Sequence, residues 1–406
     1  MPTDHSADFS RGPLADLRLI EVGTLIAGPF CGQILGDMGA QIIKVEAPGA
    51  GDPMRSWGRK KAEGKSLWWP VLARNKMSIT LDLRQPEGQE LLRELASKTD
   101  FLVENFRPGT LEKWGCGYPE LARINPRLIM IRVSGYGQTG PYASQAGFGA
   151  IGEAMGGLRY IVGDPSTPPS RVGISIGDSL AATFAALGAL SALHYRHISG
   201  RGQIVDSAIY EAVLNMMESL ITEYDQVGYI RERSGAILPQ IAPSNVYPTR
   251  DGSLVVIGAN QDTVFRRLAE AMGEPALAAQ PEYRTHKDRG EHQQQLDELL
   301  SRWTRKFTQE ELLRKMRDFG VPAGLIYRAP EMLADPHFKA REAIVSAPHP
   351  DFGELKMQNV APKLSATPGG VHTPSPTLGQ HNDEVYLNLL GLEPARYQDL
   401  KNRKII

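Results

Sequence analysis

The chain reads LRLIEVGTLIAGPFCGQILGDMGAQIIKVE from Leu17 to Glu46. Two short apolar runs, residues 17–22 and 41–46, flank a stretch of helical character, residues 29–38. A strand, a helix and a second strand in this order form a βαβ unit, in which the two strands lie parallel in one sheet. This unit predicts an α/β fold built on a large Rossmann-like parallel sheet.

The same alternation continues along the chain. Further strands are expected at residues 78–83, 101–103 and 128–133, and a second group of elements begins near Ser234. A chain of 406 residues is long enough for two domains. We therefore expect a large α/β domain over residues 1–200 and 345–406, a linker helix over 201–233, a smaller α/β domain over 234–325 and a return linker over 326–344.

Composition limits the partners and the compartment. The formal net charge is −1, which gives no support for nucleic acid or an anionic membrane as a partner. The first residues are polar, and the longest apolar run, residues 180–194, is too short to span a membrane. Two cysteines, Cys31 and Cys116, cannot form a disulfide framework. We expect a soluble, cytoplasmic protein.

Several common chemistries lack their sequence signature. No Gly-x-Gly-x-x-Gly motif follows the first expected strand, so a dinucleotide cofactor is not indicated. The nine histidines are scattered and lack metal-ligand spacing. We expect no metal and no bound cofactor, which leaves carboxylate chemistry.

One carboxylate stands out by its position. Asp178 lies in RVGISIGDSLAA, residues 171–182, where a glycine-punctuated stretch meets a helix of small residues that runs to about His197. We expect Asp178 at or beside the helix N-cap, where the unpaired N–H groups and the macrodipole favour a negative charge. An ionised carboxylate can attack an acyl carbon directly. The alternative is that Asp178 only caps the helix.

Eight segments, in order, resemble the family III CoA-transferases, a group that includes formyl-CoA:oxalate and carnitine CoA-transferases and shares its fold with α-methylacyl-CoA racemases. The resemblance covers residues 13 to about 392. The matching segments are AGP with LGDMGA (27–29 and 35–40), IKVEAPG (43–49), NKMSITLDL (75–83), VENFRPG (103–109), SGYGQTGP (134–141), GISIGD (173–178), GRGQ (200–203) and LGQH (378–381).

The resemblance implies a ping-pong transfer of CoA in which Asp178 is the nucleophile. Asp178 would form a mixed anhydride with the acyl group and then an aspartyl-CoA thioester, and the substrates would be an acyl-CoA and a small carboxylic acid. The site must stabilise an oxyanion and exclude water. The resemblance also implies an interlocked homodimer.

Further site residues are carried over from the matching segments. The resemblance places Tyr136 and Gln138 beside the reacting carbonyl, and it assigns Gly258 and Ala259 to a loop of the smaller domain that covers Asp178. Ala47 and Ser134 depart from the basic residues that some members have at these positions. The CoA contacts implied are Leu25, Ile26, Leu81, Arg84, Asn105 and Lys113. Each has a structural alternative, namely a core position for the leucines and isoleucine, a solvated charge for Arg84 and Lys113, and a turn for Asn105.

Two other activities are weighed against transfer. The racemases use a histidine in Ala-Gly-His-Asp, but the matching stretch here has Phe148 and Gly149, which cannot move protons. A non-catalytic CoA-binding protein would not need an intact Asp178 preceded by Gly173 and Gly177.

The stretch Arg171-Val172-Gly173 indicates which carboxylic acids are substrates. It resembles the matching stretch of family members that use succinyl-CoA with C4–C6 dicarboxylates. We hypothesise that Arg107 or Arg171 pairs with the distal carboxylate of such an acid, because a guanidinium binds a carboxylate in a bidentate manner. The alternative, given equal weight, is that both arginines hold loops together.

Overall fold

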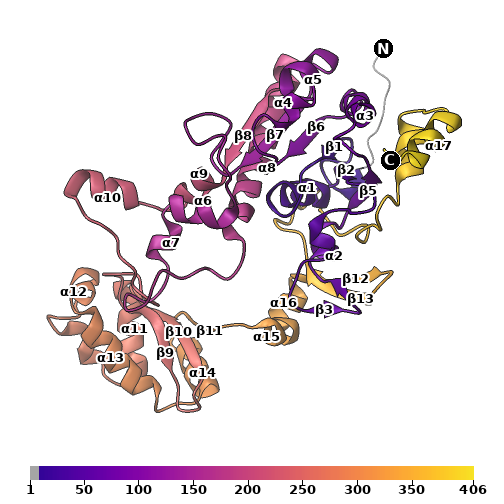
Figure 1. Ribbon diagram of the computed structural model, residues 1–406. Helices are drawn as coiled ribbons and strands as arrows, with labels where there is room; N and C mark the ends of the chain where they lie inside the picture. Colours follow the sequence, from indigo (N-terminus) through magenta and orange to yellow (C-terminus); the bar gives the residue numbers. More distant parts are fainter. Residues whose placement is uncertain (1–8) are drawn as a thin grey trace. The chain divides into compact units, whose positions relative to one another are not determined.

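The chain forms two compact units, which we describe separately (Figure 1). The computed structural model describes residues 9–406. The first unit contains the chain up to Leu158, residues 172–223 and residues 337–406, and the second contains residues 159–171 and 224–336.

A six-stranded sheet forms the centre of the first unit, with the strand order β5-β2-β1-β6-β7-β8. All neighbouring strands are parallel, which confirms the parallel sheet. The sheet starts at β1 and grows first to one side and then to the other, as in Rossmann folds. The strands are β1 (Arg18–Glu21), β2 (Gln41–Glu46), β5 (Lys76–Thr80), β6 (Phe101–Glu104), β7 (Ile129–Ser134) and β8 (Ile204–Ala208).

The linker helix expected over residues 201–233 is wrong. Its first part is the edge strand β8, and the helical part is divided into α9 (Ile209–Leu214) and α10 (Leu220–Val227). The residue Glu218, between the two helices, has a φ of 51°, which a right-handed helix cannot contain. The chain therefore turns between α9 and α10.

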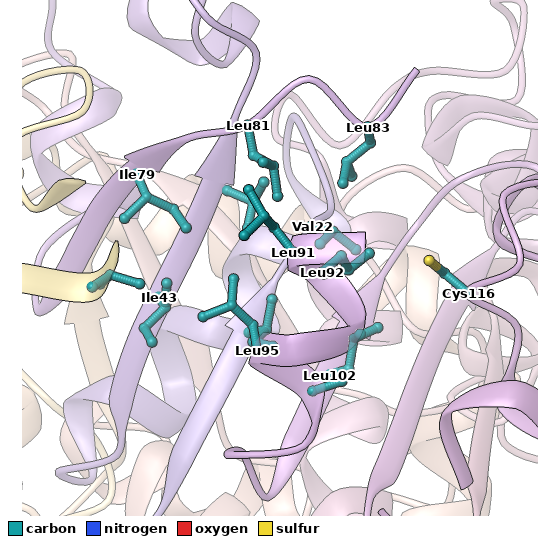
Figure 2. Packing of buried hydrophobic residues seen from close by; sticks show 14 of the residues in the cluster. Val22, Ile43, Ile79, Leu81, Leu83, Leu91, Leu92, Leu95, Leu102 and Cys116 are labelled. Carbon is teal, nitrogen blue, oxygen red and sulfur yellow. The ribbon is translucent and has the colours of Figure 1, made fainter. Parts of the chain in front are cut away.

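Helices cover both faces of the sheet. On one face α1, α8 and α9 pack over residues such as Leu19, Val103 and Ile131, and on the other α3, α5 and α17 pack over residues such as Ile20 and Ile43. Figure 2 shows the second core, where Leu91, Leu92 and Leu95 of α3 meet the strands. The helices are α1 (Ala27–Asp37), α3 (Pro86–Ala96), α4 (Thr110–Lys113), α5 (Tyr118–Ile124), α6 (Gly149–Met155), α8 (Ile176–Ser199) and α17 (Pro394–Asn402).

Within residues 9–406, α8 is the one helix long and apolar enough to cross a membrane by length and composition alone. Its alanines at 181, 182, 185, 189 and 192 are buried against the sheet and α1. These contacts account for the apolar side of α8 that faces the sheet.

Residues 381–386 cover the free edge of β5. The N–H of Ser78 donates to Nδ1 of His381 at 3.1 Å, and the N–H of Thr80 donates to Oδ1 of Asn382 at 2.9 Å. Tyr386 in the π-helical turn η4 (Glu384–Leu389) donates its hydroxyl to the Thr80 carbonyl at 2.7 Å. Side chains thus satisfy backbone groups that an edge strand would otherwise expose.

The second unit has its own sheet, with the order β11-β10-β9 and antiparallel pairing. Its core includes Tyr247, Phe265, Leu296 and Leu312. The elements are β9 (Ser244–Pro248), β10 (Leu254–Gly258), β11 (Ala323–Leu325), α11 (Asp262–Met272), α12 (His286–Glu291), α13 (Gln293–Thr304) and α14 (Gln309–Asp318).

The remaining elements are short. Two antiparallel hairpins, β3–β4 and β12–β13, belong to the first unit. Their bounds and those of the remaining helices are β3 (Lys61–Ala62), β4 (Lys65–Ser66), β12 (Ile344–His349), β13 (Gly353–Gln358), α2 (Trp69–Leu72), α7 (Leu158–Ile161), α15 (Ala329–Ala334), α16 (Pro336–Ala340) and the 3-10 turns η1 (Phe9–Arg11), η2 (Pro53–Arg55) and η3 (Pro275–Ala279).

Candidate active site

The carboxyl ends of β1 and β6 lie together where the sheet changes its direction of growth, the place where open α/β sheets bind ligands. Asn105, directly after β6, forms two hydrogen bonds with the backbone of Thr24, which follows β1. Its Oδ1 accepts the Thr24 N–H and its Nδ2 donates to the Thr24 carbonyl, both at 2.8 Å. Asn105 therefore joins the two loops, and its amide is engaged in that role.

The loop after β1 also contains a strained residue. Leu25 has a φ of 64°, a left-handed conformation that is rare for residues other than glycine. Its N–H donates to Oδ1 of Asp52 at 3.3 Å. Leu25 and Ile26 are half-buried and pack on a small cluster that includes Met54 and Trp69. Their side chains are therefore partly accessible at this end of the sheet.

A cluster of buried charges lies beneath this loop. Nζ of Lys44 is 3.0 Å from Glu21 and 2.8 Å from Asp52, and all three side chains are almost fully buried. Burial opposes a charge on the ammonium, but the two carboxylates outweigh it and raise the pKa of Lys44 above its usual value. The two carboxylates thus favour the protonated form of Lys44.

Asp178 is the third residue of α8, after the N-cap residue Ser175. It lies in the first turn and not at the cap itself, which is a small correction to the expected position. The half-buried carboxylate is near the positive end of a 24-residue helix, where a negative charge is stabilised. This placement is compatible with a nucleophile.

Gly149, the first residue of α6, lies against Asp178. A Cβ added to Gly149 would be 2.2 Å from Oδ2 and 2.8 Å from Cγ of Asp178, closer than nonbonded atoms can approach. Any side chain at residue 149 would therefore displace the carboxylate. From the sequence alone, Gly149 argued only against racemase chemistry.

Glu153, one turn further along α6, is a site residue that the sequence analysis missed. Its side chain is 1% exposed and lies against Gly177, the residue before Asp178. Residues 149 and 153 are four apart and thus share one face of the helix. This spacing is visible in the sequence, but it indicates a shared site only when the packing of α6 against α8 is known.

The loop after β7 packs against the segment that enters α6. Gly135 and Gly147 are in backbone contact, and a Cβ on Gly147 would be 3.2 Å from Cε2 of Tyr136. The N–H of Gln138 donates to Asp206 at 2.9 Å, while its side-chain Nε2 is buried and makes no hydrogen bond within residues 9–406. The structure thus brings the Tyr136 loop to the segment that contacts Asp178.

Two glycine patterns could suggest other chemistry. The expectation from the sequence that Gly-x-Ser-x-Gly is absent is wrong, because residues 173–177 form this pattern. Ser175, however, is the N-cap residue of α8, and no strand precedes it between residues 162 and 175. A serine nucleophile requires a strand-to-helix turn at this point. Residues 135–140 form Gly-x-Gly-x-x-Gly after β7, but the next helix begins only at Gly149. Neither pattern has its required context.

The other predicted site residues of the first unit differ in their exposure to solvent. The Leu81 side chain is 2% exposed and is part of the core (Figure 2), so the structural alternative holds for this side chain. Arg84 is highly exposed and forms an ion pair with Asp82 at 2.8 Å. Lys113, at the end of α4, and Arg107 are exposed.

Three predicted residues belong to the second unit, whereas Asp178 belongs to the first. Gly258 ends β10, and its N–H donates to the Pro322 carbonyl at 3.0 Å. Ala259 is fully buried in the core of the second unit, and Arg171 is exposed.

The family of the chain follows from comparison with known proteins. Residues 14–382 match the model of CoA-transferase family III. The chain belongs to this family. It is 62% identical to a succinyl-CoA–D-citramalate CoA-transferase of Chloroflexus aurantiacus, covering 97% of this chain and 98% of that protein. It is 36% identical to a succinate–glutarate CoA-transferase of Agrobacterium fabrum, covering 94% and 96%.

The fold is also shared with solved structures. A CAIB/BAIF family protein from Brucella suis superposes with a TM-score of 0.82 at 32% identity, covering 93% of this chain and all of that chain. The sequence-based assignment to the family III CoA-transferases is therefore confirmed, and the protein is an enzyme that transfers CoA.

Proposed function

We propose that this CoA-transferase moves CoA from succinyl-CoA to a C4–C6 dicarboxylate, with Asp178 as the nucleophile and no cofactor besides the CoA thioester. The relatives named for succinyl-CoA, citramalate and glutarate support the substrate class. The observation that carries the mechanism is the Asp178 carboxylate at the start of α8, held against a glycine that leaves it room.

The reaction begins at the thioester of the donor. An oxygen of Asp178 attacks the succinyl carbonyl carbon, the C–S bond breaks, and CoA leaves as a thiolate. The thiolate then attacks Cγ of Asp178, which releases succinate and forms an aspartyl-CoA thioester. The acceptor carboxylate attacks that thioester, and the returning thiolate attacks the acceptor carbonyl, which regenerates Asp178.

Several groups of this chain would support these steps. The Nε2 group of Gln138 is a buried donor that could bind an oxyanion, and Tyr136 lies in the same loop. Gly258 and Ala259 remain proposed for the covering loop. Leu25, Ile26, Asn105, Arg84 and Lys113 remain proposed on the CoA side, and Arg107 and Arg171, both exposed, remain proposed for the distal carboxylate.

We further propose a cytoplasmic homodimer. Along α8, Leu187 is 59% and Ile198 is 75% exposed in the single chain, although the opposite face of the helix is core. Exposed apolar side chains of this size favour an interface between proteins. An interlocked dimer, as implied by the family resemblance, would cover them.

Trapping of the acylated enzyme tests the mechanism. Incubation with succinyl-CoA and hydroxylamine should convert Asp178 to a hydroxamate that mass spectrometry locates, and Asp178→Asn should lose both the trapped product and the transfer of CoA. Glu120→Gln is the control, because Glu120 is also an acid in a first helical turn of the same unit. Full transfer by Asp178→Asn would exclude the proposed nucleophile.

A further inference from the structure

The loop between β1 and α1 is fixed at three consecutive residues by three different groups. The Gly23 carbonyl accepts a hydrogen bond from Nζ of Lys44 at 3.0 Å. Thr24 is held on both its backbone groups by Asn105. The N–H of Leu25 donates to Asp52 at 3.3 Å. Three of the five residues that connect β1 to α1 are thus held by side chains from other segments.

Asp52 has a central place in this arrangement. Its Oδ1 accepts the N–H groups of Leu25 and Met54, the latter at 2.9 Å, and its Oδ2 is 2.8 Å from Nζ of Lys44. The N–H of Asp52 donates to Glu46 at 2.8 Å, and Glu46 in turn forms an ion pair with Arg55 at 2.7 Å. The Asp52 carboxylate therefore cannot move without disturbing β2 or the loop.

Lys44 is linked to two residues of the loop, Gly23 and Leu25. One ammonium contacts the Gly23 carbonyl directly and the Leu25 N–H through Asp52, and its remaining partner is Glu21 at the end of β1. Buried ion pairs contribute little to stability compared with apolar packing of the same volume, because desolvation of the charges offsets their attraction. We therefore explain the cluster of Lys44, Glu21 and Asp52 by the conformation that it imposes on the loop between β1 and α1.

That conformation is strained at Leu25, and strained residues held by their surroundings are concentrated at functional sites. The loop also lies at the carboxyl ends of β1 and β6, where a parallel sheet of this order binds its ligand. The strain and the location are independent observations, and both indicate a ligand-binding loop.

We propose that Asp52, through its buried ion pair with Lys44, is a positioning residue that holds Leu25 in the left-handed conformation required to bind acyl-CoA. This inference rests on the proposed function, since it names CoA thioesters as the ligand of the loop. Asp52 acts through Leu25 and does not itself need to touch the substrate.

A matched pair of variants tests the proposal. Asp37 and Arg74 form another buried ion pair in the same unit, at 2.6 Å, but at the opposite end of α1. Asp52→Asn and Asp37→Asn each remove one buried negative charge. We expect Asp52→Asn to raise the KM for succinyl-CoA roughly tenfold with little change in kcat, and Asp37→Asn to leave KM unchanged. Asp52→Ala, which also removes the acceptor of the Leu25 N–H, should have the larger effect.

Direct binding separates this inference from the proposed function. Calorimetry with CoA on the Asp178→Asn protein gives a dissociation constant that does not depend on turnover. The Asp178→Asn protein should bind CoA but not transfer it, as the proposed function requires. If the double variant Asp178→Asn/Asp52→Asn then binds CoA with the same dissociation constant, the inference about Asp52 is overturned and the proposed function stands. If wild-type protein neither binds CoA nor transfers it, the proposed function fails first. Should Asp52→Ala not fold, Asp52→Asn alone decides, because it retains an acceptor oxygen.

Discussion

The carboxylate of Asp178 occupies the space that a side chain at residue 149 would fill. Only the hydrogen of Gly149 fits there, since a Cβ would lie 2.2 Å from Oδ2. Asp178 is the third residue of α8 and Gly149 is the first residue of α6, so the contact joins the first turns of the two helices. The position of the Asp178 carboxylate, the proposed nucleophile, is therefore limited by a residue that has no reactive side chain.

Gly149→Ala should lower kcat roughly a hundredfold, because a small displacement of a reacting group can cost that much in rate. The added methyl group must push the Asp178 carboxylate away or shift α6. Steady-state kinetics with succinyl-CoA measures the loss. Gly324→Ala is the control, since a Cβ there meets no atom within 4 Å. An unchanged kcat in Gly149→Ala would contradict the geometry of the site.

The stability of the protein should decrease as the pH falls below about 6.5, the ordinary pKa of histidine. Burial lowers the pKa of His381 and of His349 in the folded protein. The unfolded chain therefore binds protons first, and stability present above pH 6.5 is lost as the pH falls toward the folded pKa values. Protonation would also remove the lone pair of His381 that accepts the Ser78 N–H.

Thermal unfolding measured from pH 7.5 to pH 5 checks this prediction. His381→Asn should have a flatter dependence of Tm on pH, because asparagine offers an acceptor but does not titrate. His197→Gln is the control, since His197 is exposed on α8. A Tm that is constant over this range, or equally steep in His381→Asn, would contradict the assignment.

Asn382→Ala should lower the free energy of unfolding by about 1–3 kcal/mol, the cost of leaving buried polar groups without partners. Asn382 accepts the Thr80 N–H and donates to Thr80 Oγ1 at 2.8 Å, so both groups of the edge strand lose their partner. Chemical denaturation measures the change. Asn402→Ala, at an exposed position near the C-terminus, should change stability by less than about 0.5 kcal/mol.

The parallel sheet could be predicted because its signals are local. The strands β1 and β2 and the helix between them each have a clear apolar pattern within eleven residues or fewer. Strand β8 was missed because residues 204–208 read Ile-Val-Asp-Ser-Ala and follow the glycines at 200 and 202. Only pairing with β7 makes this segment a strand. The tertiary context of this segment, and not its local sequence, therefore determines that it forms a strand.

In the candidate site too, the local features could be predicted from the sequence and the long-range contacts could not. Asp178 was identified from its helix start and its resemblance to the family motif, both of which are contained in twelve residues. Its contact with Gly149 joins residues 29 positions apart in the sequence, and the link from Leu25 through Asp52 to Lys44 depends on the fold of three segments. A side chain such as Leu81 also cannot be assigned to a core or a ligand site before the packing is known. Distances of this kind do not follow from residue patterns.

The choice of acceptor acid should depend on a distal carboxylate. With succinyl-CoA as donor, C4–C6 dicarboxylates should be accepted and monocarboxylates of the same length should be accepted poorly. If Arg107 or Arg171 binds that carboxylate, replacement of the arginine by alanine should reduce the preference for dicarboxylates over monocarboxylates by roughly tenfold or more. The rate with monocarboxylates should change little. A preference that persists in both variants would assign the arginines to loop structure.

Homodimer formation should depend on the exposed side of α8. Leu187→Glu and Ile198→Lys place charges on side chains that are 59% and 75% exposed in the single chain, so they should not disturb the monomer core. Burial of an unpaired charge in an interface is costly, and we expect both variants to shift the protein toward monomers in light scattering after size-exclusion chromatography. Ile124→Lys, on α5, is the control, because Ile124 is also exposed but its helix packs on the opposite face of the sheet. If wild-type protein is monomeric, or if all three variants elute and scatter as the wild type does, the α8 surface is not the dimer interface.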